Sequence, residues 1–285
     1  MIRLLITHTL LLLVIGALAG IFGAILGIGG GIILTPVLTI ILGLPIKYAI
    51  GASIIAVIAT SSGSTIAYLK DDMLNLRVAM FLEIATTIGA IVGALLIGVA
   101  PKNIIYVLFG CLLLFAMVNM GRKLWSKKQH NQEIVADKIA QKMRLNGHYY
   151  DKASQQEYQY QVKNVPGGFI MMLGAGLASG LLGIGAGAFK VIAMDNIMHM
   201  PLKPSSATSN LMMGVTAAAS AMIYFLNGDI RPDIAAPITI GILCGAFFGT
   251  RIMQHLNPRM IRIIFIPILA YMGLQMVLKG FGVNF

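Results

Sequence analysis

Two glycine-rich stretches, GIGGGIILTP at residues 27–36 and GIGAGAFKVI at residues 183–192, have the composition of anion-binding loops. Glycine lets backbone N–H groups approach a ligand closely, and a helix that begins just after the glycines adds the positive end of its dipole. The candidate binding residues are Gly29, Gly30, Gly31, Gly185, Ala186 and Gly187. A nucleotide site is not favoured, because neither stretch ends in the Lys-Ser/Thr of a P-loop and a preceding strand is missing.

The side chains nearest to these stretches in the sequence suit the same ligand. Lys190 lies in the apolar run GAGAFKVIAM, and a charge inside a bilayer costs roughly 2.5–3.5 kcal/mol on insertion scales, so we expect it to face an anion. The alternatives are extension of Lys190 to the membrane interface or pairing with Asp195. Neutral donors follow at Ser53, Thr208, Ser209 and Asn210, although helical Ser and Thr also bond to their own backbone.

Glu83 and Asp195 are two further ionisable residues within apolar segments, and either is a candidate to carry a coupling proton. The alternatives are an interfacial position for Glu83 and a counter-ion role for Asp195. Cys111 and Cys244 lack a CxxC pair or histidine cluster, which favours packing over metal or redox chemistry. The 18 methionines are scattered along the sequence, which also favours packing or lipid contact. We predict no cofactor, no metal and no enzyme activity, because no nucleophile–base pair stands out.

The elements that carry these residues are membrane helices. The chain of 285 residues is 58% hydrophobic and 11% charged, whereas soluble domains carry roughly 25% charged residues. Apolar runs near the bilayer-spanning length of about 20 residues occur at 8–26, 48–69, 76–99, 103–120, 167–182, 207–226, 234–254 and 260–278. The first run continues directly into the glycines, so we interpret it as a retained helix and not a cleaved signal peptide. The sequence predicts an all-α polytopic membrane protein with 8–10 transmembrane segments.

An internal duplication relates the two glycine-rich stretches. An offset of 156 residues aligns their glycines and also pairs Pro45 with Pro201, Lys47 with Lys203, Ser53 with Ser209, Thr60 with Thr216, and Tyr68 with Tyr224. Apolar similarity alone would not keep glycine, proline and polar positions in one register. Each repeat reads as a helix, a glycine break, a short apolar segment and three further helices. Paired broken helices at membrane depth are the pattern of a transporter's binding site.

The direction of the two repeats is left open by the sequence. If the short apolar segments cross the membrane, each half has five spans and the halves are inverted. If those segments are re-entrant, each half has four spans and the halves are parallel. The positive-inside rule barely separates the two arrangements. We favour inverted repeats because they provide alternating access directly.

A polar connector separates the repeats and divides the chain into residues 1–121, 122–165 and 166–285. Residues 122–165 hold nine Lys or Arg against four acidic residues, and basic loops stay in the cytoplasm. We therefore expect an integral protein of the plasma membrane with this loop in the cytoplasm. Residues 130–143 predict a short helix and residues 144–168 a β-hairpin with a turn at 152–156. The basic residues form no motif for nucleic acid, so none is expected as a partner.

These features resemble the sulfite exporter TauE/SafE family, also described as the 4-toluene sulfonate uptake permease family. The resemblance rests on the paired glycine stretches, the LGLPIKYAIGAS turn at 42–53 and the ATSN helix start at 207–210. It implies that Gly27, Gly29, Gly30, Gly31, Gly183, Gly185, Gly187, Thr208, Ser209 and Asn210 lie at family site positions. Ala186 and Ile192 depart from the pattern, which has glycine and proline there.

The resemblance and the residues together predict a secondary transporter of a small sulfur-containing oxyanion such as sulfite or an organosulfonate. Its partners would be that anion, the lipid bilayer and a coupling proton or cation. The alternatives are an anion channel, which would conduct without trans-stimulated exchange, and a membrane-anchored partner protein with no transport activity.

Overall fold

The computed structural model describes residues 2–26, 29–70, 72–125, 137–151, 155–255 and 258–283. Within this part of the chain, six helices are long and apolar enough to cross a membrane, and three shorter apolar segments accompany them at Thr9–Ile25, Gly31–Ile41 and Ile266–Gly280. Large apolar side chains such as Met80, Ile84 and Leu95 of one helix are exposed, as a lipid-facing surface requires. The predicted all-α polytopic membrane fold is confirmed.

The helices follow one order in both halves of the chain. The first half has α1 (Ile2–Leu26), α2 (Gly31–Pro36), the π-helical segment η1 (Val37–Ile41), α3 (Ile46–Lys70), α4 (Leu76–Ile97) and α5 (Lys102–Trp125). The second half has α7 (Val165–Leu182), α8 (Gly187–Ile192), the π-helical segment η2 (Ala193–Ile197), α9 (Leu202–Leu226), α10 (Pro232–His255) and α11 (Pro258–Gly280). Helix bounds repeat at the offset of 156 residues, from Gly31 to Gly187 and from Lys70 to Leu226.

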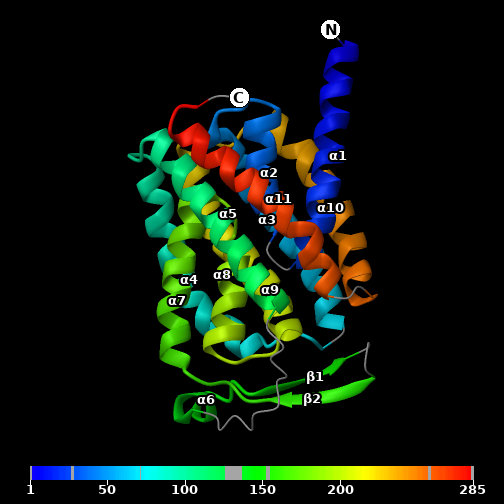
Figure 1. Ribbon diagram of the computed structural model, residues 1–285, viewed down its shortest axis with the longest axis vertical. Coiled ribbons are helices and arrows are strands. Elements are labelled where there is room, and N and C mark those ends of the chain that lie inside the picture. The colour runs from blue at the N-terminus through cyan, green and yellow to red at the C-terminus, as the bar shows by residue number, and fades with distance from the viewer. Residues whose placement is uncertain are drawn as a thin grey trace.

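One helix of each half packs against helices of the other half. α10 packs against α1 and α3, and α4 packs against α7 and α9. We call α1, α2, η1, α3 and α10 the first bundle, and α7, α8, η2, α9 and α4 the second bundle. In Figure 1 α1 and α10 lie on the right, and α4 and α7 on the left. α3 packs against α9 where the two bundles meet.

Glycine allows the helices within each bundle to touch backbone to backbone. A Cβ atom at Gly180 of α7 would overlap the carbonyl oxygen of Ala90 in α4, and one at Gly245 of α10 would overlap that of Ala17 in α1. Small residues dominate helix interfaces in lipid for this reason, since dispersion contacts there replace the hydrophobic effect. α4 and α10 are therefore held by close packing along much of their length.

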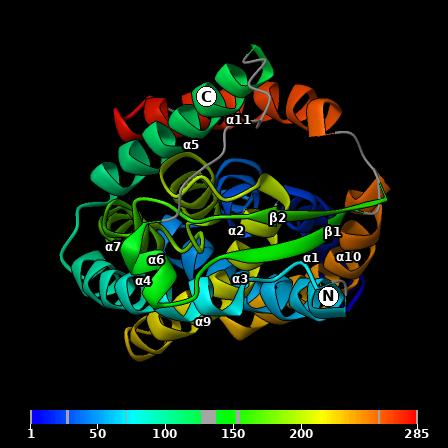
Figure 2. The ribbon, with the colours of Figure 1, turned by 90° about the horizontal axis from the view of Figure 1, so that it is seen from below.

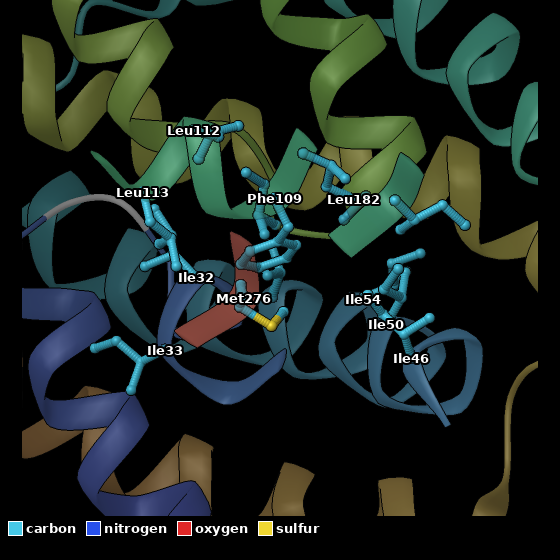
Figure 3. Packing of buried hydrophobic residues seen from close by; sticks show 14 of the residues in the cluster. Ile32, Ile33, Ile46, Ile50, Ile54, Phe109, Leu112, Leu113, Leu182 and Met276 are labelled. Atoms are coloured by element: carbon cyan, nitrogen blue, oxygen red, sulfur yellow. The ribbon is translucent and has the colours of Figure 1, made fainter. Parts of the chain in front are cut away.

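The last helices of the two halves, α5 and α11, pack against each other along one side of the molecule (Figure 2). A buried apolar cluster joins this pair to the bundles. Figure 3 shows Phe109 and Leu113 of α5 and Met276 of α11 beside Ile32 of α2 and Ile50 of α3. The pair therefore covers the place where α2 and α3 meet the second half.

The connector lies at the end of the molecule opposite to both termini (Figure 1). It contains α6 (Lys138–Lys142) and an antiparallel pair, β1 (Gly147–Asp151) and β2 (Gln156–Tyr160). The strands flank the predicted turn, and α6 falls within the predicted short helix, while 126–136 lies outside the described residues. Seen from below, the hairpin extends across the helix ends from α6 towards α10 (Figure 2).

Asn75 joins the connector to the membrane helices. Its side chain accepts a hydrogen bond from the Val78 N–H at 3.1 Å, which caps α4, and donates to the Leu145 carbonyl at 2.8 Å and to the Tyr160 hydroxyl at 3.0 Å. Burial raises the pKa of the Tyr160 phenol, and the hydrogen bond from Asn75 opposes that shift. A single side chain thus orients both the start of α4 and the hairpin.

The sulfur-containing residues differ in their burial. Five methionines gather in one buried cluster, in agreement with the packing role expected for them, because the fold brings α7, η2 and α9 together: Met172, Met194, Met198, Met200 and Met212. Cys111 and Cys244 are exposed, so they do not fill the core as packing residues.

Candidate functional site

The two glycine breaks, at residues 29–31 and 183–187, are in contact with each other. A Cβ atom at Gly31 would lie 3.0 Å from the carbonyl oxygen of Gly183, so the backbones of the two breaks are in close contact. Gly29 and Gly185 have positive φ angles of +75° and +67°, which glycine adopts without the steric cost that Cβ imposes. Gly27 lies outside the described residues. The predicted anion-binding backbones therefore come together from opposite halves of the chain.

Two apolar side chains lie between the breaks. Val57 of α3 and Met213 of α9 both lie next to Gly29 and Gly185, and both are fully buried. They occupy equivalent positions, separated by the offset of 156 residues. Residues 29–31 and 185–187 of the breaks are buried in this conformation, beside these two side chains of α3 and α9.

Ala186 is a non-glycine residue in a left-handed conformation. Its φ is +48°, and it immediately precedes α8. An L-residue there costs roughly 1–2 kcal/mol, because Cβ crowds the following carbonyl. The alanine that stands in place of glycine here therefore has a strained backbone, next to Gly187, where α8 begins.

Ser53 and Ser209 hold the short break helices. The Ser53 hydroxyl is 2.6 Å from that of Thr35 in α2, and the Ser209 hydroxyl donates to the Gly187 carbonyl of α8 at 3.2 Å. The two serines are equivalent at the offset of 156 residues. Both predicted site serines therefore lie at the breaks, each linking the long central helix of its bundle to the short one.

The side chains of Thr208 and Asn210 form their hydrogen bonds away from the glycine breaks. The Thr208 hydroxyl accepts a hydrogen bond from the backbone N–H of Asn75 at 3.1 Å, on the connector side of α9. The Asn210 amide nitrogen donates to the Ser206 carbonyl at 3.1 Å, and the backbone carbonyl of Asn210 accepts from Ser61. Residues one apart on a helix project about 100° apart, so the run 208–210 cannot direct all three side chains at one ligand.

Lys190 and Glu83 form a buried ion pair within the second bundle. Lys190 is fully buried and Glu83 is 8% exposed, and Lys190 Nζ lies 3.9 Å from Glu83 Oε2. Thr216 of α9 bridges them: its hydroxyl accepts a hydrogen bond from Lys190 and donates to Glu83 Oε1 at 2.6 Å. Thr87 also donates to Oε1, at 3.2 Å. The predicted anion-facing lysine and one coupling candidate are therefore partners.

The sequence did not indicate this arrangement. The alternative partner considered for Lys190 was Asp195, but Asp195 lies half-buried in η2, and the ion pair of Lys190 is with Glu83 on α4. Thr216 and Thr87 were not predicted as site residues. The spacing of Glu83 and Thr87 is one available signal, since residues four apart share a helix face.

The cluster occurs in one bundle only. Leu34, Thr60 and Thr239 occupy the positions equivalent to Lys190, Thr216 and Glu83. Thr60 and Thr239 donate to carbonyls of their own helices, those of Ala56 and Ala235. The two otherwise matched bundles thus differ in charge next to the breaks.

Apolar spanning helices, two short broken helices and a buried charged cluster beside them form the pattern that membrane transporters show. Residues 12–276 match the family described as "Sulfite exporter TauE/SafE", and the chain belongs to that family. It is 24% identical over 277 residues to the probable membrane transporter protein YunE of Bacillus subtilis, covering 95% of this chain and 97% of the relative.

A second relative is the probable membrane transporter protein MJ0441 of Methanocaldococcus jannaschii. It is 27% identical over 285 residues, covering 94% of this chain and 95% of the relative. No solved structure matches the chain.

Proposed function

We propose that the protein is a secondary transporter of a small sulfur-containing oxyanion, such as sulfite or an organosulfonate. The meeting of the two glycine breaks supports this proposal most directly, because it brings two short helix starts together between two matched bundles, and glycine lets backbone N–H groups approach an anion there. The family description, which names sulfite, agrees with this choice of substrate. The anion would bind at the backbone of Gly29–Gly31 and Gly185–Gly187.

Transport would proceed by alternating access, with the two bundles rocking about the contact between α3 and α9. The termini lie at one end of the molecule and the connector at the other (Figure 1), which supports halves that run in opposite directions along it. Inverted repeats of this kind allow one closed conformation to open to either side. The basic connector would lie in the cytoplasm and the protein in the plasma membrane.

Counterflow in proteoliposomes tests this function. Vesicles that contain the full-length protein are loaded with unlabelled sulfite or methanesulfonate, and uptake of the labelled anion is followed. Transport predicts uptake that is stimulated by the anion inside, and protein-free vesicles provide the baseline. A steady anion current without trans-stimulation would indicate a channel, and no uptake of either anion would exclude this substrate class.

A further inference from the structure

The cluster of Lys190, Thr216 and Glu83 is electrically balanced before any substrate enters. It holds one cation and one carboxylate, and both are buried. Buried ions are stable only when paired and hydrogen-bonded. A monoanion that binds next to this cluster brings a second negative charge, which the single lysine cannot neutralise while Glu83 is ionised.

Glu83 has an oxygen atom that is suited to take up a proton. Oε1 accepts from Thr216 and Thr87, whereas Oε2 has no hydrogen-bond partner among the described residues and lies 3.9 Å from Lys190 Nζ. A proton on Oε2 would neutralise the carboxyl and leave the bonds to Oε1 in place. Lys190 would then have an unpaired positive charge available for an anion.

Among the described residues, Lys190 is the charged group that interacts electrostatically with the Glu83 carboxylate. α7 has no titratable side chain along Val165–Leu182. α9 has Lys203 and Tyr224 near its two ends, η2 has Asp195, and α4 itself has Arg77 in its first turn. Lys190 of α8 is the cation within 4 Å, so the charge state of Glu83 and the electrostatic availability of Lys190 are linked.

We propose that Glu83 binds one proton at Oε2 each time a substrate monoanion binds, with Lys190 supplying the charge that holds the anion. This inference rests on the proposed transport function and names its coupling ion and site. The proton enters from water on one side, stays on Glu83 while the anion is bound, and leaves to water on the other side. Because the equivalent positions Leu34 and Thr239 carry no charge, the first bundle has no matching pair, and one proton moves per anion.

The test uses wild-type protein in proteoliposomes and labelled methanesulfonate, a monoanion whose own charge does not change near neutral pH. One-to-one cotransport with a proton is electroneutral. A gradient of one pH unit therefore drives about tenfold accumulation of the anion, since each 1.4 kcal/mol is a factor of ten. An imposed membrane potential has no effect on that accumulation. Uptake that follows the potential and ignores the pH gradient overturns the proposal.

Substitution of Glu83 locates the proton site. Glu83→Gln mimics the protonated carboxyl, so we expect exchange of methanesulfonate to persist, accumulation in a pH gradient to disappear, and uptake to become sensitive to membrane potential. Glu157→Gln on β2, an exposed carboxylate with 62% side-chain exposure, is the matched control and should behave like the wild type. Accumulation in a pH gradient that survives Glu83→Gln refutes the assignment of the proton to Glu83.

The double variant Glu83→Gln with Lys190→Met tests the role of the lysine. It removes both charges together, so the fold is kept without a buried unpaired ion, and monodisperse elution in detergent verifies this. We expect its exchange of methanesulfonate to be lost. Exchange at the wild-type rate would overturn the role of Lys190. If the wild type exchanges neither methanesulfonate nor sulfite, the proposed function itself fails, whereas exchange without proton coupling refutes only this inference.

Discussion

Tyr68 and Tyr224 make the same hydrogen bond in the two halves of the chain. Each hydroxyl donates to the carbonyl of the residue 44 positions earlier, that of Ala24 at 3.2 Å and that of Gly180 at 2.8 Å. Both tyrosines are fully buried. They tie the end of each long central helix to the helix that precedes the glycine break.

We predict that Tyr68→Phe and Tyr224→Phe destabilise the protein to a similar extent, by about 1 kcal/mol each, because each removes a buried, hydrogen-bonded hydroxyl and keeps the ring. Thermal unfolding in detergent measures the effect. Tyr158→Phe is the control, since the Tyr158 hydroxyl bonds to Gln156 on the exposed hairpin. A large effect at only one of the two buried tyrosines would show that the two halves do not share this contact equally.

Gly180→Ala should disrupt the packing of α7 on α4. The added Cβ would overlap the carbonyl oxygen of Ala90, and overpacking of this kind costs about 1–3 kcal/mol. Gly174→Ala in the same helix is the matched control, because a Cβ there meets nothing within 4 Å. It should raise stability slightly, since alanine favours helices over glycine. Equal unfolding temperatures for the two variants would contradict the close contact of α4 and α7.

The ion pair of Lys190 and Glu83 predicts strong non-additivity. Lys190→Met alone leaves a buried carboxylate without its cation, and loss of one partner of a buried pair costs about 3–5 kcal/mol. Adding Glu83→Gln removes that carboxylate charge and should restore much of the stability. A double-mutant cycle from unfolding in detergent measures this coupling. Additive effects would show that the two side chains do not interact.

Asn75 predicts separable effects on helix and hairpin. Asn75→Asp keeps an oxygen to cap α4 but loses the donors to Leu145 and Tyr160, whereas Asn75→Ala loses both functions. We expect faster hydrogen exchange across 147–160 in both variants. The start of α4 should be affected only in Asn75→Ala, with about 1 kcal/mol for the lost cap. Unchanged exchange in the hairpin would mean that Asn75 does not hold it.

The sequence was sufficient to predict the elements but not their partners. Glycine, proline and polar residues in one register located the two breaks, because these residues are unusual inside apolar helices and recur at one offset. The exchange of α4 and α10 between halves depends on surfaces far apart in the chain, and local patterns do not record it. For that reason the lysine of α8 could be recognised as a buried charge, while its partner on α4 could not be identified.

The polar run at 208–210 shows the same limit on a smaller scale. Composition marked Thr208, Ser209 and Asn210 as one group, but the helix turns about 100° per residue and separates them. Ser209 lies at the break, where it bonds to Gly187, and Thr208 bonds to Asn75. The direction in which each residue projects from the helix must therefore be known before the residues of a motif are assigned to one site.

The most direct test of the account is the distance between the two bundles with and without substrate. Ile84 on α4 and Ile240 on α10 are equivalent at the offset of 156 residues, and each is 57% exposed. Spin labels at these positions, after replacement of the exposed Cys111 and Cys244, report that distance by pulsed electron resonance. A pair at Ile84 and Ile170, both in the second bundle, is the control and should not change. Rocking bundles predict two distances for the first pair, with populations that shift when methanesulfonate is added. A single distance that is the same with and without the anion would contradict alternating access.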